Sequence, residues 1–269
     1  MPPAQQNSAR EVLSFYAEAG VDALVGEEPV NHFAQEAVEP PRPAPVRAPE
    51  IKSALPPLAP SVAPPAPDVA AMEAREAVKN VQTLQELRDV LGRFEGCALR
   101  ATATQLVFAD GNPEARIIFV GEAPGRDEDI EGLPFVGRSG KLLDRMMAAI
   151  GLDRTQAYIA NIIPWRPPGN RTPTPQESQI CLPFIRKQIE LVDPDILVCL
   201  GGPSATTLLD IKEGITKSRG RWVNYNTGKR EIRALATFHP AFLLRSPLQK
   251  RLAWRDLLAI KKALAEAAP

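Results

Sequence analysis

The sequence predicts an α/β fold, a three-layer α/β/α sandwich around a four-stranded parallel sheet. Four short apolar runs of strand type alternate with segments in which apolar residues recur at helical spacing, which is typical of a parallel sheet covered by helices on both faces. The chain has 269 residues, 44% of them hydrophobic, enough for one large domain with an appendage. No apolar run approaches the roughly 20 residues that span a bilayer, so we expect no membrane protein.

Two segments ahead of the sheet differ in composition from the rest. Residues 1–33 are predicted to contain a helix, because Ser8-Ala-Arg-Glu has the form of a capping box and apolar residues follow at helical spacing. Residues 34–80 are predicted to be a linker, since 11 prolines fall within the 28 residues from Pro40 to Pro67. A protein partner of the helix or of the proline-rich segment is the alternative reading. Residues 81–269 form the predicted folded domain.

The elements of this domain follow in a regular order. An amphipathic helix runs from Leu84 to Leu91, and the strands cover residues 116–120, 158–162, 195–200 and 232–237. Helical spacing predicts helices at residues 141–150, 177–191 and 204–209, and a closing helix at 249–267. In this architecture ligands bind beyond the carboxyl ends of the strands.

Charge and cysteine content bound the function classes. Residues 1–82 carry six basic and eleven acidic side chains, whereas residues 83–269 carry 26 and 21, so a polyanionic ligand is possible for the second part. Three widely spaced cysteines, Cys97, Cys181 and Cys199, argue against a disulfide framework and for a reducing compartment. The N-terminus shows no secretory leader. We therefore expect a cytoplasmic protein.

Unusual residues gather in the loops that follow the strands. These are Gly121-Glu-Ala-Pro-Gly-Arg-Asp-Glu-Asp129 and Pro134-Phe-Val-Gly137, then Asn161 and Arg166-Pro-Pro, then Gly201-Gly-Pro, and finally Phe238-His-Pro-Ala-Phe-Leu-Leu-Arg245. The residues of these loops exclude a P-loop, because Leu142 stands where Ser or Thr would bind Mg²⁺. The loop after the first strand also does not match the glycine pattern of dinucleotide-binding proteins. Two histidines and scattered cysteines cannot build a zinc site.

The combination of these four loops resembles the uracil-DNA glycosylase superfamily, most closely family 4, over roughly residues 84–262. The resemblance implies a monomeric DNA glycosylase that hydrolyses the N-glycosidic bond of uracil in DNA, leaves an abasic site and starts base excision repair. Residues 81–269 would then be the catalytic domain, associated with the nucleoid when it is on DNA. A glycosylase for another deaminated base and a non-catalytic, damage-sensing DNA-binding module are the alternatives.

The resemblance also implies roles in a uracil pocket. His239 would donate to the uracil carbonyl oxygen as negative charge develops, Asn161 would pair with the amide edge of the base, and Phe135 would stack on it. The pocket would be closed by backbone groups of Gly121, Glu122 and Ala123. A carboxylate among Glu122, Glu128 and Asp129 would position water or stabilise the sugar cation, with Glu128 or Asp129 as the first choice.

Contacts with DNA are expected beside this pocket. By resemblance Leu243, Leu244 and Arg245 would enter the duplex and fill the gap left by the flipped base. Basic residues near a bound duplex typically neutralise its phosphates. We expect Arg166, Arg171, Lys217, Arg219 and Arg221 to contact DNA in this way.

The sequence departs from the family at its cofactor. Family-4 enzymes usually hold a 4Fe–4S cluster with four cysteines. Aligned on the flanking motifs, this chain retains Cys97 and Cys181, whereas Phe94 and Trp165 stand at the other two positions. Two thiolates cannot hold a cubane that needs four, so we expect no cluster and no metal. One branch of the superfamily becomes covalently attached to its product and carries a histidine-containing insertion ahead of its fourth strand. Residues 214–221 of this chain have no histidine, which argues against that branch.

Overall fold

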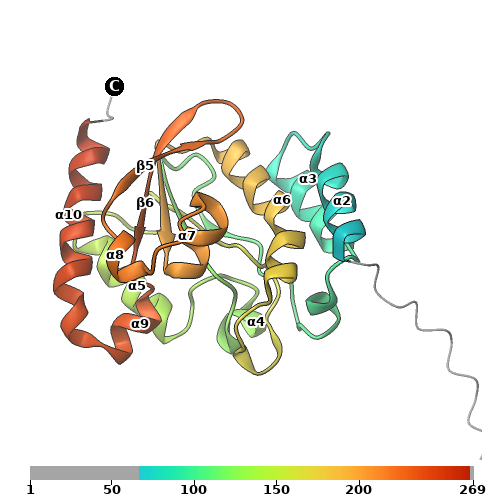
Figure 1. Ribbon diagram of the computed structural model, residues 1–269, viewed down its shortest axis with the longest axis horizontal. Coiled ribbons are helices and arrows are strands. Elements are labelled where there is room, and N and C mark those ends of the chain that lie inside the picture. Colours follow the sequence, from blue (N-terminus) through green and yellow to red (C-terminus); the bar gives the residue numbers. More distant parts are fainter. Residues whose placement is uncertain (1–66, 267–269) are drawn as a thin grey trace, which may run out of the picture. The chain divides into compact units, whose positions relative to one another are not determined.

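The computed structural model describes residues 67–266, and the order of its elements follows the predicted alternation (Figure 1). The helices are α2 (Pro67–Val78), α3 (Leu84–Arg93), α4 (Arg126–Glu131), α5 (Arg138–Ala148), α6 (Pro175–Val192), α7 (Gly202–Leu209), α8 (Ile215–Ser218), α9 (Pro240–Arg245) and α10 (Lys250–Glu266). The strands are β1 (Asp110–Gly111), β2 (Ile117–Gly121), β3 (Tyr158–Asn161), β4 (Ile196–Leu200), β5 (Trp222–Asn226) and β6 (Glu231–Thr237). Between residues 67 and 266, no helix has the length and apolar character needed to cross a bilayer.

The sheet has six strands in the order β1-β3-β2-β4-β6-β5. The four central strands are parallel, which confirms the predicted core of the sheet. The sheet also has two strands that the sequence does not predict, because β1 and β5 pair antiparallel at the two edges. Neither edge strand has a strong sequence signal: β1 is only two residues long, and β5 mixes Trp, Val and Tyr with two Asn. Edge strands are buried on fewer sides, so their pattern is weaker.

Helices cover both faces of the sheet. On one face, α2, α3, α6 and α7 pack over alternate strand residues that include Ile118, Tyr158 and Leu197. On the other face, α5, α9 and α10 pack over the intervening residues, which include Phe119 and Ile159. Figure 1 shows α10 on one side of the strands and α6, α3 and α2 on the other. The predicted three-layer arrangement is confirmed.

The folded domain begins earlier than expected. Helix α2 lies inside residues 34–80, which the sequence assigns to the linker, and its Ala70 and Ala74 are fully buried in the core beneath α6. The boundary at residue 80 is therefore too late. Alanine-rich helices have a weak apolar signal, and Pro67 at the first helical position is tolerated because its missing N–H has no partner there. The predicted helix in residues 1–33 and the rest of the linker lie outside the described residues.

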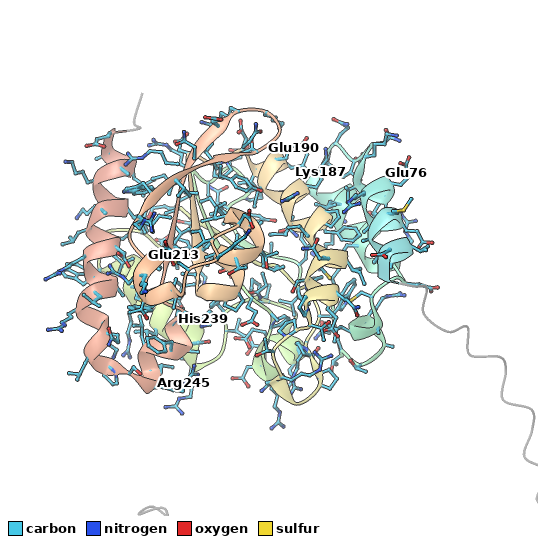
Figure 2. All side chains as sticks on the ribbon, in the orientation of Figure 1. Glu76, Lys187, Glu190, Glu213, His239 and Arg245 are labelled. Atoms are coloured by element: carbon cyan, nitrogen blue, oxygen red, sulfur yellow. The ribbon has the colours of Figure 1, made fainter. Side chains whose placement is uncertain are left out.

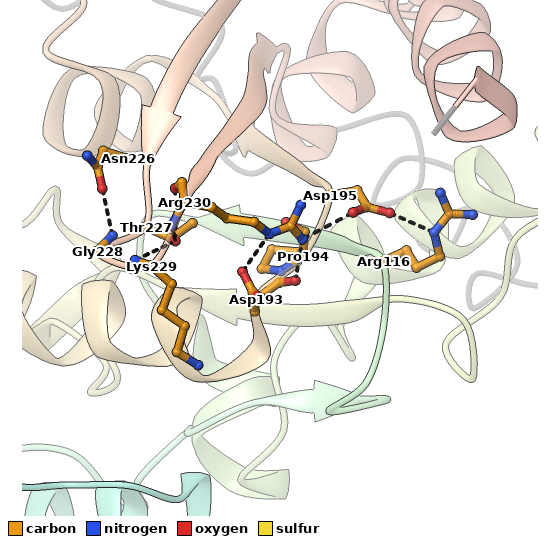
Figure 3. A network of polar contacts seen from close by, with 9 residues as sticks. All are labelled: Arg116, Asp193, Pro194, Asp195, Asn226, Thr227, Gly228, Lys229 and Arg230. Atoms are coloured by element: carbon orange, nitrogen blue, oxygen red, sulfur yellow. Dashed lines mark hydrogen bonds and ion pairs between the residues drawn. The ribbon is translucent and has the colours of Figure 1, made fainter. Parts of the chain in front are cut away.

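Ion pairs connect the amino-terminal ends of neighbouring strands, at the end of the sheet opposite the strand carboxyl ends (Figure 3). Arg116, just before β2, donates from Nε to Oδ2 of Asp195 at 2.6 Å. Arg230, in the turn between β5 and β6, donates from Nε to Asp193 at 2.8 Å and from Nη2 to Asp195 at 3.1 Å. These pairs fix the starts of β2, β4 and β6 relative to one another and leave the carboxyl ends free for function.

Candidate active site

The carboxyl ends of β2 and β3 place a glycine and an asparagine side by side. Gly121 ends β2, Asn161 ends β3, and the strand register pairs them. Because side chains alternate along a strand, Asn161 lies on the same face of the sheet as Ile159, the face covered by α5 and α10. Asn161 is 6% exposed, and its Oδ1 has no hydrogen-bond partner among the described residues. A buried, unpaired acceptor is costly, so it indicates a position where a ligand donates.

The ring of Phe135 closes over this position. A Cβ added to Gly121 would lie 2.6 Å from Cζ of Phe135 and 2.3 Å from Oδ1 of Asn161, so only glycine permits the three to converge. The Phe135 ring also stacks on the imidazole of His239, with ring centroids 5.6 Å apart and planes inclined by 30°. The structure thus brings Gly121, Phe135, Asn161 and His239 together at the carboxyl ends of the strands, and this cluster is the candidate pocket.

His239 is held in one tautomer by the start of α9. Its Nδ1 accepts a hydrogen bond from the backbone N–H of Ala241 at 3.1 Å, so in the neutral ring the proton is on Nε2. Burial, together with the nearby charge of Arg245, lowers the pKa of His239 to about 4. The ring is therefore neutral at pH 7 and presents an Nε2–H donor. Figure 2 shows His239 and Arg245 at the same end of the molecule, far from Lys187 and Glu190.

A buried ion pair supports the strand end that carries His239. Asp256 of α10 is 2% exposed and accepts from Thr237 Oγ1 at 2.7 Å and from Arg219 Nε at 2.8 Å. The Arg219 guanidinium also lies 5.7 Å from the ring centre of Phe238. The prediction that Arg219 contacts phosphate is therefore wrong, because this side chain is committed to the interior.

The acidic run after β2 is also structural. It forms the short helix α4, and Glu128 and Asp129 are both buried. Glu128 accepts from the backbone N–H groups of Gly125, Val136 and Gly137 at 3.0, 3.1 and 3.0 Å. Both of its oxygens accept from backbone donors, which gives Glu128 a structural role; its role in positioning water stays a prediction.

Asp129 has a similar structural role. It accepts from the backbone N–H and the hydroxyl of Thr104 at 2.8 and 2.9 Å and from the N–H of Gln105 at 3.3 Å. It therefore ties α4 to the segment before β1, and its catalytic role likewise stays a prediction. A carboxylate pattern in the sequence does not show which backbone donors surround it.

Glu122 points away from the pocket. The residue follows Gly121 by one position, so its side chain leaves on the opposite face of the sheet. There it lines an open groove of about 1390 Å³ between α2, α6 and α7. Burial raises the pKa of Glu122, and its Oε1 has no partner within residues 67–266. Its backbone, like that of Ala123, remains beside the strand end, but the carboxylate does not face Asn161.

The residues predicted to contact DNA are the end of α9 and a set of basic side chains, and their exposure and partners differ. Leu243 is 1% exposed and packs in the core, so the prediction that it enters the duplex is wrong, whereas Leu244 is 38% exposed and Arg245 is exposed beside it. Helix α9 turns Leu243 inward and its two successors outward. Three predicted arginines have side-chain partners: Arg166 with Asn170, Arg171 with Glu177 and Arg221 with Glu213, while Lys217 is exposed.

The sequence analysis does not identify two residues that hold the segments carrying Phe135 and His239. Arg154, between α5 and β3, donates to backbone carbonyl groups of the segment that carries Phe135. No sequence signal distinguishes it from a surface arginine. Asp256 could have been found, because it interrupts the buried stripe of the closing helix between Ala253 and Leu257.

The residues present do not fit a four-thiolate cluster. Cys97 and Cys181 are buried with their Sγ atoms 3.9 Å apart, and the hydrogen bond from Cys181 lowers the pKa of Cys97 and raises that of Cys181. Phe94 and Trp165 are 8% and 2% exposed in the same core, and the Phe94 ring packs edge-on against Phe184. In the described part of the chain, no group of three or more His, Cys, Asp or Glu residues is placed to hold a metal ion.

Comparisons with known proteins identify the family of the chain. The family model of the uracil DNA glycosylase superfamily matches residues 108–258, more than half of the chain. A type-4 uracil-DNA glycosylase of Thermotoga maritima is 41% identical over 169 residues, 61% of this chain and 86% of the relative. The type-4 enzyme of Archaeoglobus fulgidus is 41% identical over 171 residues, again 61% and 86%. That of Saccharolobus solfataricus is 38% identical over 189 residues, 68% and 88%. On this match and these identities, the chain belongs to the uracil DNA glycosylase superfamily.

Proposed function

We propose that the chain is a uracil-DNA glycosylase, which hydrolyses the bond between uracil and deoxyribose in DNA and so begins base excision repair. One observation carries the proposal: a neutral Nε2–H donor on His239 and an unpaired Oδ1 on Asn161 both lie next to the Phe135 ring, which packs against Gly121 at the end of β2. The names of the relatives point to the same reaction.

Asn161 supplies the discrimination between bases. Uracil presents an N3–H donor next to the O4 acceptor, and a side-chain amide matches this edge by accepting at Oδ1 and donating from Nδ2. Cytosine presents a lone pair at N3 and an amino group at position 4, so it leaves both groups of Asn161 unpaired as long as the amide keeps this orientation. Since Asn161 is buried, each mismatch carries the full cost of an unsatisfied polar group.

His239 stabilises the departing base. When the bond between N1 and C1′ breaks, its electron pair remains on the base, and the negative charge spreads to the carbonyl oxygens, while the sugar becomes an oxocarbenium-like cation. The Nε2–H donor is fixed before the reaction by the hydrogen bond from Ala241, so no reorganisation is needed as charge develops. A neutral donor avoids placing a desolvated cation at this buried position.

Water adds without a carboxylate base in the proposed mechanism. Glu128 and Asp129 are bonded to backbone donors, and Glu122 lies on the other face of the sheet. The cation at C1′ is itself a strong electrophile, so water can add once the bond has opened and release its proton to solvent. Exposed Leu244 and Arg245 beside the pocket would fill the space left by the flipped nucleotide.

We further propose that the enzyme works without the iron–sulfur cluster of its relatives. Two cysteines remain, and the aromatic side chains of Phe94 and Trp165 fill the volume beside them with apolar packing. Their burial contributes stability of the kind that the cluster would otherwise supply. Protein purified without oxygen should contain no stoichiometric iron or acid-labile sulfide, and stoichiometric amounts of both would contradict this.

Single-turnover cleavage of an end-labelled oligonucleotide with one uracil, developed with alkali in EDTA, tests the function. The wild type should release uracil, and His239→Ala should be slower by about 100- to 1000-fold, the usual effect of losing one such donor. His32→Ala, which replaces the only other histidine, is the matched control and should retain the wild-type rate. A wild type that shifts the oligonucleotide on a gel but leaves uracil in place would support the non-catalytic reading instead.

A further inference from the structure

We infer that Arg154 is a positioning residue for the reaction: it holds the backbone of Phe135 so that the ring stays over the base. This inference rests on the proposed function and extends it to a residue outside the pocket. Arg154 lies in the segment between α5 and β3 and touches neither Asn161 nor His239 through any hydrogen bond.

The Arg154 guanidinium is bound on both sides. It donates from Nη2 to the carbonyl oxygen of Phe135 and from Nη1 to that of Pro134 at 3.2 Å. Its position is fixed by two carboxylates, because Nε is 2.9 Å from Oδ1 of Asp144 and Nη1 pairs with Asp110. The planar fork thus joins β1, α5 and the Phe135 segment, and a lysine could not make all of these contacts.

Phe135 needs such a restraint because its backbone is in an unfavourable conformation. Its φ is 55°, in the left-handed region that bulky side chains rarely adopt. Its carbonyl group also lies against the first turn of α5, where a Cβ added to Gly140 would be only 1.7 Å from the oxygen. Conformations of this kind persist only where the surroundings determine them, and they concentrate at functional sites.

The neighbouring contacts show what the restraint achieves. Glu128 accepts from the N–H groups of Val136 and Gly137, while Arg154 donates to the carbonyl groups of Pro134 and Phe135. The peptide units on both sides of Phe135 are therefore held by side chains. The ring between these anchors is directed at the base position beside Gly121 and at His239. Without the Arg154 fork, the left-handed residue can relax and the ring can leave the pocket.

A double-mutant cycle tests the inference. Arg154→Met keeps the length of the apolar stem and removes the fork, and its single-turnover rate at saturating enzyme should fall by about 10- to 100-fold, the cost of a displacement of about an ångström at the reacting centre. In the Phe135→Leu background, the same substitution should change the rate by less than about twofold, because the group that it positions is already gone. Arg154→Lys should recover part of the loss.

The control is an arginine with the same kind of partners but with no hydrogen bond to the segment that carries Phe135. Arg116 pairs with Asp195 and also donates to the carbonyl oxygen of Leu264. Arg116→Met should lower the melting temperature but leave the rate unchanged. Equal fractional losses of rate for Arg154→Met in the wild-type and Phe135→Leu backgrounds would contradict the inference and assign Arg154 a merely structural role.

A readout that does not depend on uracil release separates this inference from the proposed function. The Phe135 ring current acts on the imidazole of His239, and only two histidines contribute to the spectrum. The His239 imidazole resonances of Arg154→Met should move toward those of Phe135→Leu, whereas Arg116→Met leaves them in place. Unmoved resonances overturn the inference even if the enzyme is active, and an inactive wild type with moved resonances overturns only the proposed function.

Discussion

Protonation of His239 provides a sharp test of the pocket's electrostatics. Burial first, and the charge of Arg245 second, lower its pKa from 6.5 to about 4. The unfolded chain takes up this proton near pH 6.5, whereas the folded protein takes it up only near pH 4, so between these values the unfolded state binds more protons. The contribution of His239 to the free energy of unfolding is therefore complete above pH 6.5 and decreases as the pH falls to 4.

The size of this effect follows from the lowered pKa. A pKa of about 4 in place of 6.5 corresponds to about 3 kcal/mol of stability that is lost on acidification. His239→Gln removes the titrating group, so urea denaturation of this variant should show a shallower loss of stability between pH 6.5 and 4 than the wild type shows. The glycosylase rate should show no break near pH 6.5, because the donor is already neutral there.

Imidazole NMR measures the same quantity directly. The resonances of His239, assigned by comparison with His239→Gln, should titrate near pH 4, and those at neutral pH should report a proton on Nε2. Arg245→Gln should raise this pKa without restoring its ordinary value, since burial is the larger cause. A midpoint near 6.5, or a proton on Nδ1, would refute the assignment of the neutral Nε2–H donor.

Three further substitutions have defined outcomes. Glu128→Gln turns one acceptor toward a backbone donor into a second donor, so urea denaturation should show a loss of about 1–3 kcal/mol, whereas an inactive variant of unchanged stability would restore a catalytic role to Glu128. Asp256→Ala leaves Arg219 buried without its partner and should cost about 3–5 kcal/mol in the same assay; a loss below about 1 kcal/mol would show that the pair is not formed. The double variant Cys97→Ala and Cys181→Ala should retain wild-type activity within about twofold, and an inactive but folded protein would point to a bound cluster.

The fold was predictable to the extent that buried strands and amphipathic helices repeat with fixed periods. The four central strands carry unbroken apolar runs such as Ile117-Ile-Phe-Val, and these gave the parallel core. The edge strands did not follow from the sequence, because a partly exposed strand such as β5 has no clear period. Helix α2 was assigned to the linker because alanine contributes little to an apolar stripe, although Ala70 and Ala74 are fully buried.

The site was predictable where a residue type and its place at a strand end suffice. Asn161 and His239 meet this condition, and the structure places both next to the Phe135 ring. Residues whose role depends on neighbours distant in sequence could not be assigned correctly: Glu128 and Arg219 satisfy buried partners, although the sequence suggests water and phosphate. The inward turn of Leu243 depends on how α9 packs, which a short motif does not show.

The most direct test of the central claim is the single-turnover rate of uracil release by Asn161→Asp in EDTA, with the exposed Asn224→Asp as the matched control. The carboxylate accepts from N3–H but cannot donate to O4, so the account predicts a loss of at least about 100-fold for Asn161→Asp and none for the control. A rate equal to that of the wild type would contradict the assignment of Asn161 as the group that reads uracil, and with it the pocket described above.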